Sequence, residues 1–172
     1  ANDGYAALKL GFIEVSEKAL TKPELGQFKN GVKPHKVLKE VRVANAEEFK
    51  AGDVLKADVF AAGDKVDVSG VTKGHGFTGV IKRWNQHRLK MTHGTGPVHR
   101  EPGSMGPMYS GPGGKVIKGK KLPGRMGAVK STVQRLTVAK VDVERNLVLV
   151  KGSIPGAAGS FVILKETVKP KK

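Results

Sequence analysis

Histidines whose type and spacing could do chemistry lie in the middle of the chain. His87, His93 and His99 recur at six-residue spacing. A metal site would need ligands on one helix face or a pair of cysteines, together with carboxylates. Neither condition is met, so we predict no metal site. Histidines beside arginines are better suited to donate hydrogen bonds to phosphate or to stack on bases.

A glycine motif precedes these histidines. The stretch Gly74-His75-Gly76-Phe77-Thr78-Gly79 matches the dinucleotide-binding pattern Gly-x-Gly-x-x-Gly, which requires a helix directly after it and a βαβ succession around it. The helix is doubtful, because glycines and prolines follow residues 80–85 within ten positions, and no such succession is visible. The favoured interpretation is a tight glycine turn that lets the backbone approach a phosphate or another chain.

Ser104 is the one serine whose surroundings resemble a nucleophile motif. Gly103 is one position too close for the Gly-x-Ser-x-Gly elbow, and no convincing base and acid accompany the serine. We therefore expect no catalytic residue and no cofactor. A turn serine that contacts a nucleic-acid backbone is the simpler interpretation.

The charge of the whole chain points to a polyanionic partner. Lys and Arg number 31 against 15 acidic residues, for a formal net charge of +16. With such an excess of positive charge, the expected partner is nucleic acid, an anionic membrane surface or an acidic protein. No apolar run approaches the roughly 18 residues of a membrane span, and there are no cysteines, so disulfides and thiolate metal sites are excluded.

The positive charge is concentrated in residues 72–130, which carry 12 Lys and Arg residues and one acidic residue, Glu101. The same segment holds 13 of the 23 glycines and five of the nine prolines, a density that breaks helices and strands. A disordered basic linker is the alternative interpretation. Linkers usually lack large apolar side chains, and this segment contains Phe77, Trp84, Met91 and Tyr109, so the linker interpretation is not favoured.

Two cationic motifs within this segment suit nucleic acid. Residues 118–127 alternate lysines and arginine with glycine and proline, which favours an extended strand that lays cations along phosphates. A solvated charge run or a localisation signal is the alternative. Arg83 and Trp84 combine a bidentate phosphate donor with a ring that can stack on a base. Trp84 is equally suited to anchor the base of the loop in a core.

Short strands are predicted on both sides of the basic segment. Residues 5–12 alternate apolar positions, and residues 54–60 and 65–71 look like a hairpin. Residues 45–49 suggest a short helix with Asn45 as N-cap. In the predicted strand at 132–143, the alternation of inward-facing apolar residues is shifted between Val133 and Leu136, which suggests a bulge.

Residues 144–146 form a predicted turn, and further strands are expected at 147–150 and 161–164. The fold class is therefore mainly β, a small β-barrel with a long irregular loop extension. We expect residues 1–71 and 131–168 to form the barrel, 72–130 the loop, and 169–172 a basic tail. Because the loop lies between two strands, both of its ends are anchored.

Several phrases together resemble the universal large-subunit ribosomal protein L-three family, in its bacterial and organellar form. They occur in family order and cover most of the chain. They are Gly76-Phe77-x-Gly79-x-x-Lys82-Arg83, Thr92-His93-Gly94, His99-Arg100-x-Pro102-Gly103-Ser104-Met105-Gly106, Lys118-Gly119-Lys120-Lys121-Leu122-Pro123-Gly124-Arg125-Met126-Gly127, and Val141-Asp142-Val143-Glu144-Arg145-Asn146-Leu147-x-Leu149-Val150-Lys151-Gly152-Ser153-Ile154-Pro155-Gly156.

The resemblance implies a translation-protein-type β-barrel whose long loop runs through large-subunit rRNA of the 23S type toward the peptidyl transferase centre. It also implies a structural, non-enzymatic role, early binding in subunit assembly and neighbouring ribosomal proteins as partners. Carried over by motif, the rRNA-binding residues are Arg83, Trp84, His93, Gly94, His99, Arg100, Gly103, Ser104, Lys118, Lys120, Lys121, Gly124, Arg125 and Gly127. From the charge of the segment we add Lys73, His75, Lys82, His87, Arg88 and Lys115.

The chain departs from the family pattern at several places. His75 stands where lysine is common, which makes one phosphate contact pH-dependent or replaces it by stacking. Pro107 stands where many bacterial members have a glutamine that is methylated in some of them, and residues 109–114 look like an insertion at the loop tip. Asp3-Gly4-Tyr5 resembles a phrase that normally follows an opening β segment, so we expect an N-terminally incomplete chain.

Two other functions compete with the ribosomal one. A free nucleic-acid chaperone or architectural protein would share the basic loop but would be found mostly off ribosomes. A nucleotide-dependent enzyme rests only on the glycine motif, and absence of NAD or ATP binding would exclude it. The resemblance places the protein on cytoplasmic ribosomes, or alternatively on those of a chloroplast or mitochondrion, with no membrane and no small-molecule substrate as partner.

Overall fold

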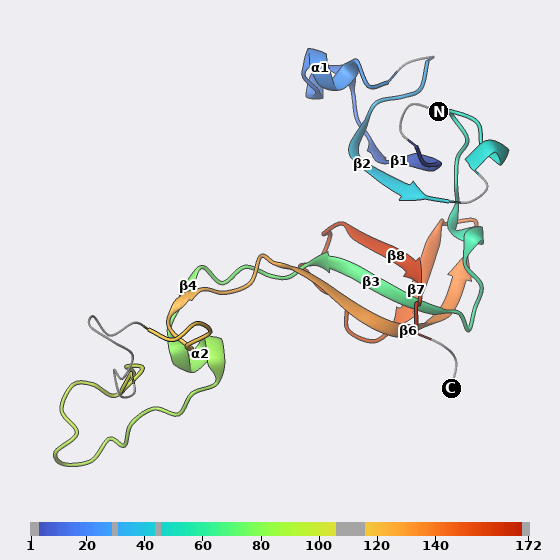
Figure 1. Cartoon of the computed structure of the whole chain (residues 1–172). Coiled ribbons are helices and arrows are strands. Elements are labelled where there is room, and N and C mark those ends of the chain that lie inside the picture. The colour runs from blue at the N-terminus through green and yellow to red at the C-terminus, as the bar shows by residue number, and fades with distance from the viewer. Residues whose placement is uncertain (1–3, 29–30, 44–45, 106–115, 170–172) are drawn as a thin grey trace. The chain divides into compact units, whose positions relative to one another are not determined.

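The computed structural model describes residues 4–28, 31–43, 46–105 and 116–169. It is mainly β, as the sequence predicted, and its strands form antiparallel sheets (Figure 1). The chain divides into two compact units, Ala1–Lys56 and Ala57–Lys172. The functional residues predicted from the sequence all belong to the second unit.

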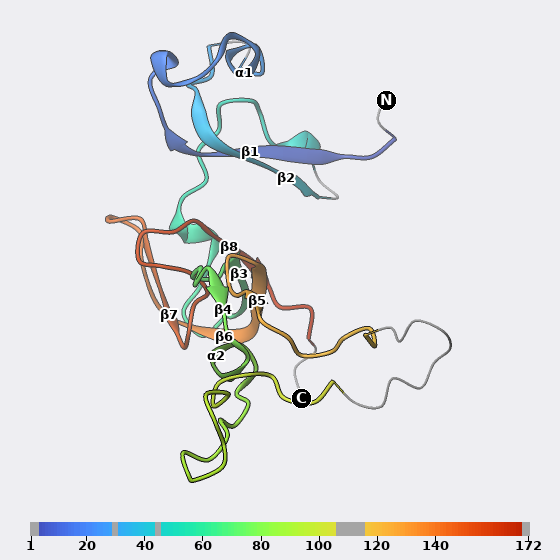
Figure 2. The same cartoon turned by 90° about the vertical axis from the view of Figure 1, so that its left-hand side faces the viewer.

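The first unit is built on a two-stranded sheet. β1 (Ala7–Glu14) pairs antiparallel with β2 (His35–Arg42), as Figure 2 shows. Between them lie a 3-10 turn, Glu17–Ala19, and α1 (Lys22–Leu25), at whose start the Glu24 carboxylate accepts a hydrogen bond from the Thr21 backbone N–H. The predicted strand at 5–12 is confirmed, whereas β2 was not predicted.

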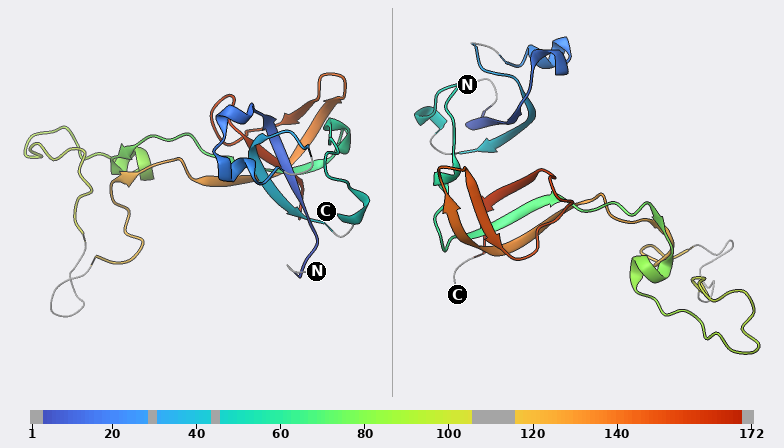
Figure 3. Two further views of the ribbon diagram at one scale, coloured as in Figure 1. Left: turned by 90° about the horizontal axis from the view of Figure 1, so that it is seen from above. Right: turned by 180° about the vertical axis from the view of Figure 1, so that it is seen from behind.

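The second unit centres on a four-stranded sheet in the order β7-β6-β3-β8, which the right view of Figure 3 shows from behind. The strands are β3 (Lys65–Val71), β6 (Lys130–Asp142), β7 (Leu147–Lys151) and β8 (Val162–Glu166). Val66, Val68 and Val138 are its buried core, and Leu136, Val150 and Leu164 are among the apolar side chains packed on it. The predicted strands β6, β7 and β8 and the turn at 144–146 are confirmed.

The predicted small β-barrel is not closed among the described residues. β7 pairs only with β6 and β8 only with β3, so both are edges of an open sheet. Closure would require hydrogen bonds between the two outer strands.

The predicted hairpin over residues 54–71 is wrong in its first half. Residues 54–60 contain a 3-10 turn, Ala57–Val59, instead of a strand. The Ala57 N–H donates to Asn146 Oδ1 at 2.7 Å, and Val54 is left exposed. A tertiary bond therefore overrides the β propensity of this run. The predicted helix at 45–49 is a 3-10 turn, Ala46–Glu48, and its expected N-cap, Asn45, lies outside the described residues.

The predicted bulge in β6 is confirmed. Val66 pairs with Leu136 and Val68 with Val133, so the single residue Asp67 opposes two residues of β6. Arg135, one of the two, has φ 60°, and its backbone N–H donates to Asp67 Oδ1 at 2.9 Å. At the bulge, the Arg135 N–H has no partner in the sheet ladder. The carboxylate of Asp67, which is buried, accepts a hydrogen bond from this N–H instead.

We expect Asp67→Asn to lower the melting temperature at neutral pH by several degrees and to weaken the acid sensitivity of the fold. The Arg135 backbone hydrogen bond lowers the pKa of Asp67 below its ordinary value, against the opposing effect of burial. The ionised carboxylate thus stabilises the fold above its ordinary pKa of 3.8, and this contribution disappears as the pH falls through the lower folded-state pKa.

Thermal unfolding of both chains between pH 7 and pH 2.5 tests this expectation. The gap between their melting temperatures should be largest near neutrality and should narrow in acid. The exposed Asp58 offers a control, because Asp58→Asn removes a carboxylate without a bulge to support. A gap for Asp67→Asn that is constant with pH would contradict the proposed role of the charge.

Candidate nucleic-acid interface

Two strands leave β3 and β6 and run side by side as an extended arm, which we define as residues 72–84 and 122–129 (Figure 1). Backbone hydrogen bonds join Thr72 to Val129 and Ala128, and Met126 to His75 and Gly76, at 2.9–3.2 Å. β4 (Phe77–Thr78) then pairs antiparallel with β5 (Gly124–Arg125). The basic segment is therefore ordered at its base by its own backbone pairing.

The doubt about a helix after the glycine motif was wrong. Residues Val80–Trp84 form α2, which begins after an extended Gly79 and ends at Asn85 in the left-handed region, φ 54°. The dense glycines and prolines begin only beyond this point, so they do not break it. Because β4 and β5 are antiparallel and two residues long, the motif does not lie in the parallel βαβ unit that a dinucleotide site needs.

Two side chains of α2 fasten the outgoing strand of the arm to the returning one. Arg83 Nη1 and Trp84 Nε1 both donate to the Leu122 carbonyl oxygen, each at 2.9 Å. The Arg83 guanidinium carbon also lies 4.9 Å from the centroid of the Trp84 ring. Arg83 and Trp84 therefore act as an anchor at the base of the loop. Their predicted contacts with rRNA stay a prediction.

Two glycines of the arm lie at close approaches, Gly127 to the backbone of the opposite strand and Gly124 to the Arg83 side chain. A Cβ on Gly127, whose φ is +75°, would lie 1.9 Å from the Lys73 carbonyl oxygen. A Cβ on Gly124 would lie 2.5 Å from Arg83 Nη1. Both glycines were predicted as rRNA-binding residues, and the structure gives each a packing reason of its own.

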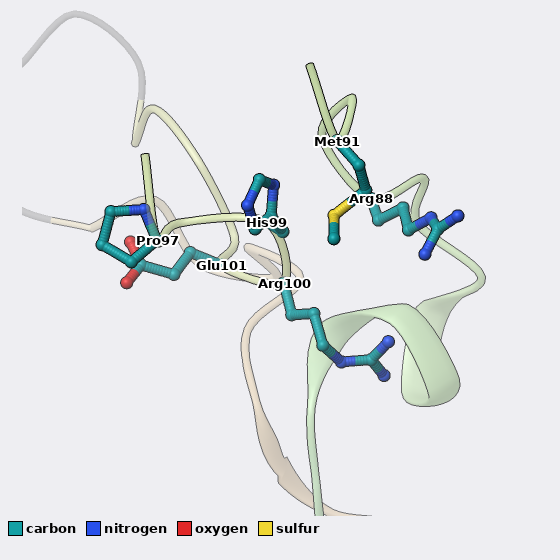
Figure 4. A pocket seen from close by; sticks show the side chains of 6 residues that line it. All are labelled: Arg88, Met91, Pro97, His99, Arg100 and Glu101. Atoms are coloured by element: carbon teal, nitrogen blue, oxygen red, sulfur yellow. The ribbon is translucent and has the colours of Figure 1, made fainter. Parts of the chain in front are cut away.

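Beyond α2, the loop folds back on itself around His99. The Leu89 N–H donates to the His99 carbonyl oxygen at 3.0 Å, and an open hollow of about 380 Å³ lies nearby. Figure 4 shows the Met91 thioether turned toward the His99 ring, while the Arg88 and Arg100 guanidinium groups extend away from it. The residues that line the hollow are Arg88, Met91, Pro97, His99, Arg100 and Glu101.

The predicted histidines differ in accessibility. His75, His87 and His93 are exposed. His99 is half-buried, and its Nδ1 atom is buried without a hydrogen-bond partner among the described residues. Those residues hold no cluster of three or more His, Cys, Asp or Glu side chains that could bind a metal.

Apart from Arg83, the described cations of the segment are exposed. Those that are exposed include Lys73, Lys82, Arg88, Arg100, Lys118, Lys120, Lys121 and Arg125, and Arg83 is half-buried. Over the described ranges the only ion pair is Lys33 with Glu14, in the first unit. Within these ranges no carboxylate neutralises the loop cations by an ion pair, which leaves them suited to phosphate.

The distal part of the loop contains further residues of the predicted site. Lys120 Nζ donates to the Ser104 carbonyl oxygen at 3.4 Å, and the predicted contacts Gly94 and Gly103 have positive φ with open space around them. Lys115, Pro107 and the insertion at 109–114 lie outside the described residues. The described residues of the predicted site are therefore spread along the arm and the loop and are not gathered in one pocket.

The sequence prediction omitted Phe77 from the site. Its side chain is 81% exposed, although it lies in the paired part of the arm.

None of the helices among the described residues is long and apolar enough to cross a membrane.

Comparison with known proteins gives consistent matches. A family model described as Ribosomal protein L3 matches residues 22–143. The large ribosomal subunit protein uL3 of Carboxydothermus hydrogenoformans is 50% identical over 172 residues, which cover 99% of this chain and 80% of that protein. The proteins of the same name from Heliobacterium modesticaldum and a Geobacillus species are 49% and 48% identical over 170 residues, 98% of this chain and 79% of each relative.

Proposed function

The chain belongs to the ribosomal protein L3 family, structural and non-enzymatic constituents of the ribosome, and we propose that it binds large-subunit rRNA through the arm and the loop that follows it. The observation that carries this proposal is the exposure of the loop cations without carboxylate partners among the described residues. Neutralising phosphates releases counterions and orders such a segment.

The arm explains how an irregular segment can be delivered to RNA. Its backbone pairing and the two bonds to Leu122 hold the base of the loop in place before binding. Less conformational freedom then remains to be lost when the loop meets RNA. The proposed organisation is a β domain of residues 1–71 and 131–168, an rRNA-penetrating loop of 72–130, and a basic tail of 169–172.

The finer parts of the function rest on the family. We propose 23S-type rRNA as the partner, together with neighbouring large-subunit proteins. The chain would bind early in subunit assembly and support the region near the peptidyl transferase centre. Bacterial relatives favour cytoplasmic ribosomes as the location. A free nucleic-acid chaperone is disfavoured, because the curated relatives are named as large ribosomal subunit proteins.

We expect affinity for a large-subunit rRNA transcript to fall steeply with salt, by roughly tenfold for each doubling of concentration if three to four phosphates are neutralised. Filter binding or fluorescence anisotropy between 50 and 400 mM salt measures the slope. Replacing Lys118, Lys120 and Lys121 with glutamine should reduce the slope by about two to three. An affinity that does not change with salt would exclude the proposed mechanism.

A further inference from the structure

Phe77 is a large apolar side chain that the protein leaves in water at a braced position. It is 81% exposed, whereas Val80, three residues later in α2, is 1% exposed. The arm thus buries a small apolar side chain and leaves the aromatic ring outside. Burial is favourable for a ring of this size, and the exposed ring on this braced strand is open to contact with a partner outside the chain.

The position of Phe77 in the arm brings a cation beside it. Phe77 pairs directly with Arg125 across β4 and β5, and side chains of directly opposed residues emerge on the same face of a pair. Arg125 is exposed and has no ion pair among the described residues. One face of the arm therefore carries an aromatic ring and a guanidinium group next to each other.

The charge of the surroundings selects the chemistry of the partner. Residues 72–130 contain one acidic residue against 12 Lys and Arg residues, and that acid, Glu101, lies at the hollow in the distal loop. An apolar protein surface would gain nothing from this excess. A nucleotide with an unstacked base offers a flat π face for the ring and a phosphate for the cation.

We propose that Phe77 is a stacking platform for one unpaired nucleobase of large-subunit rRNA, and that Arg125 binds an adjoining phosphate. The proposal deepens the proposed function and rests on it. The platform is prepared in advance, because the Arg83 and Trp84 bonds to Leu122 fasten the same two strands a few residues away. Little order then has to be created when the base stacks.

The test compares Phe77→Leu, Phe77→Trp and Arg125→Gln in the full chain, with Phe49→Leu as a control that removes an exposed aromatic from the first unit. Two RNA probes are used, a large-subunit rRNA transcript and a fully paired RNA duplex of similar length. Affinity is measured over a series of salt concentrations. Melting temperatures establish that each variant folds, which exposure of Phe77 leads us to expect.

Phe77→Leu should weaken binding to the transcript on the order of tenfold without changing the salt slope, since stacking releases no counterions. Phe77→Trp should bind like the unaltered chain, and Phe77→Leu should not affect duplex binding. Arg125→Gln should reduce the salt slope by about one. The control should bind both probes normally.

Three results would contradict the proposed stacking role of Phe77. Phe77→Leu could bind the transcript as tightly as the unaltered chain, or lose the same affinity on the duplex, or change the salt slope as a distorted arm would. If Phe77→Leu leaves transcript binding intact but impairs incorporation into subunits, the ring serves a protein partner instead. These outcomes leave the proposed function standing, whereas failure of the unaltered chain to bind the transcript would overturn both.

Discussion

Gly127→Ala is expected to weaken binding to a large-subunit rRNA transcript by roughly 30- to 700-fold while the four-stranded sheet stays folded. The added Cβ would lie 1.9 Å from the Lys73 carbonyl oxygen, so the two strands of the arm must separate at this point. Overpacking of this kind destabilises by about 1–3 kcal/mol, and the left-handed φ adds about 1 kcal/mol for a residue with a Cβ.

The affinity should fall because the arm no longer presents the loop in one arrangement. Hydrogen bonds flank Gly127 on both sides, from Met126 to Gly76 and from Ala128 to Thr72. If the strands separate in the free chain, RNA binding has to restore their pairing, and each 1.4 kcal/mol of that restoration lowers affinity about tenfold. The sheet core at Val66, Val68 and Val138 makes no use of this contact.

Gly76→Ala is the matched control. Gly76 lies in the opposite strand of the arm with φ +65°, but a Cβ there would meet nothing within 4 Å. The variant therefore carries the left-handed strain without the clash, and its affinity should fall by roughly fivefold. Amide hydrogen exchange at Met126 and Ala128 should accelerate in Gly127→Ala far more than in Gly76→Ala. Equal effects of the two substitutions would refute the steric explanation.

The bulge in β6 could be predicted because it leaves a local mark. The inward-facing apolar residues change phase between Val133 and Leu136, and a change of phase in a strand requires an extra residue. The partner of the bulge could not be predicted in this way. Asp67 is brought to Arg135 by strand pairing across 68 residues, and a single sequence carries no signal of that pairing.

The failures among the strands have separate causes. Residues 54–60 have the composition of a strand, but the Ala57 N–H is taken by Asn146, 89 residues away. β2 has the adjacent apolar residues Val37 and Leu38 on opposite faces and Lys39 beside them, which hides its alternation. Closure of the barrel depends on whether the two outer strands pair with each other, and local sequence patterns do not determine that pairing.

Composition located the basic segment but not its internal structure. Counting charge and glycine gave residues 72–130 as one loop, whereas the described part contains paired strands, α2 and an anchor at Leu122. Arg83 illustrates the difference. Its type suggests a phosphate contact, yet its guanidinium group is half-buried and donates to a backbone carbonyl. The direction of a side chain depends on the fold around it.

Deleting residues 91–114 is expected to leave the rest of the chain folded and to impair assembly or activity of the large subunit. Among the described residues of this part, 91–105, the backbone is tied to its surroundings by two hydrogen bonds, from the Leu89 N–H to the His99 carbonyl and from Lys120 Nζ to the Ser104 carbonyl. The sheet and the Leu122 anchor lie outside the deletion. The melting temperature of the four-stranded sheet should stay within a few degrees of that in the unaltered chain.

The deletion tests the contribution of the loop's shape to function, because it removes part of the loop and leaves almost all of its charge. Residues 91–114 contain Arg100 and Glu101 as their only Lys, Arg, Asp or Glu side chains, so the net charge of the chain is unchanged. Eleven of the 12 cations of the segment remain. The salt slope of transcript binding should therefore fall by no more than about one, although subunits that contain the variant should be defective in assembly or in peptide-bond formation.

The triple glutamine variant of Lys118, Lys120 and Lys121 provides the contrast, because it keeps the loop and removes charge. It should lose affinity at low salt and reduce the slope by about two to three, and higher protein concentration should restore its incorporation into subunits. The deletion should not be rescued in this way, since the missing contacts are those of shape. If the deletion lowers the salt slope as much as the triple variant, or abolishes cooperative unfolding, residues 91–114 are not a separable, shape-fitting element.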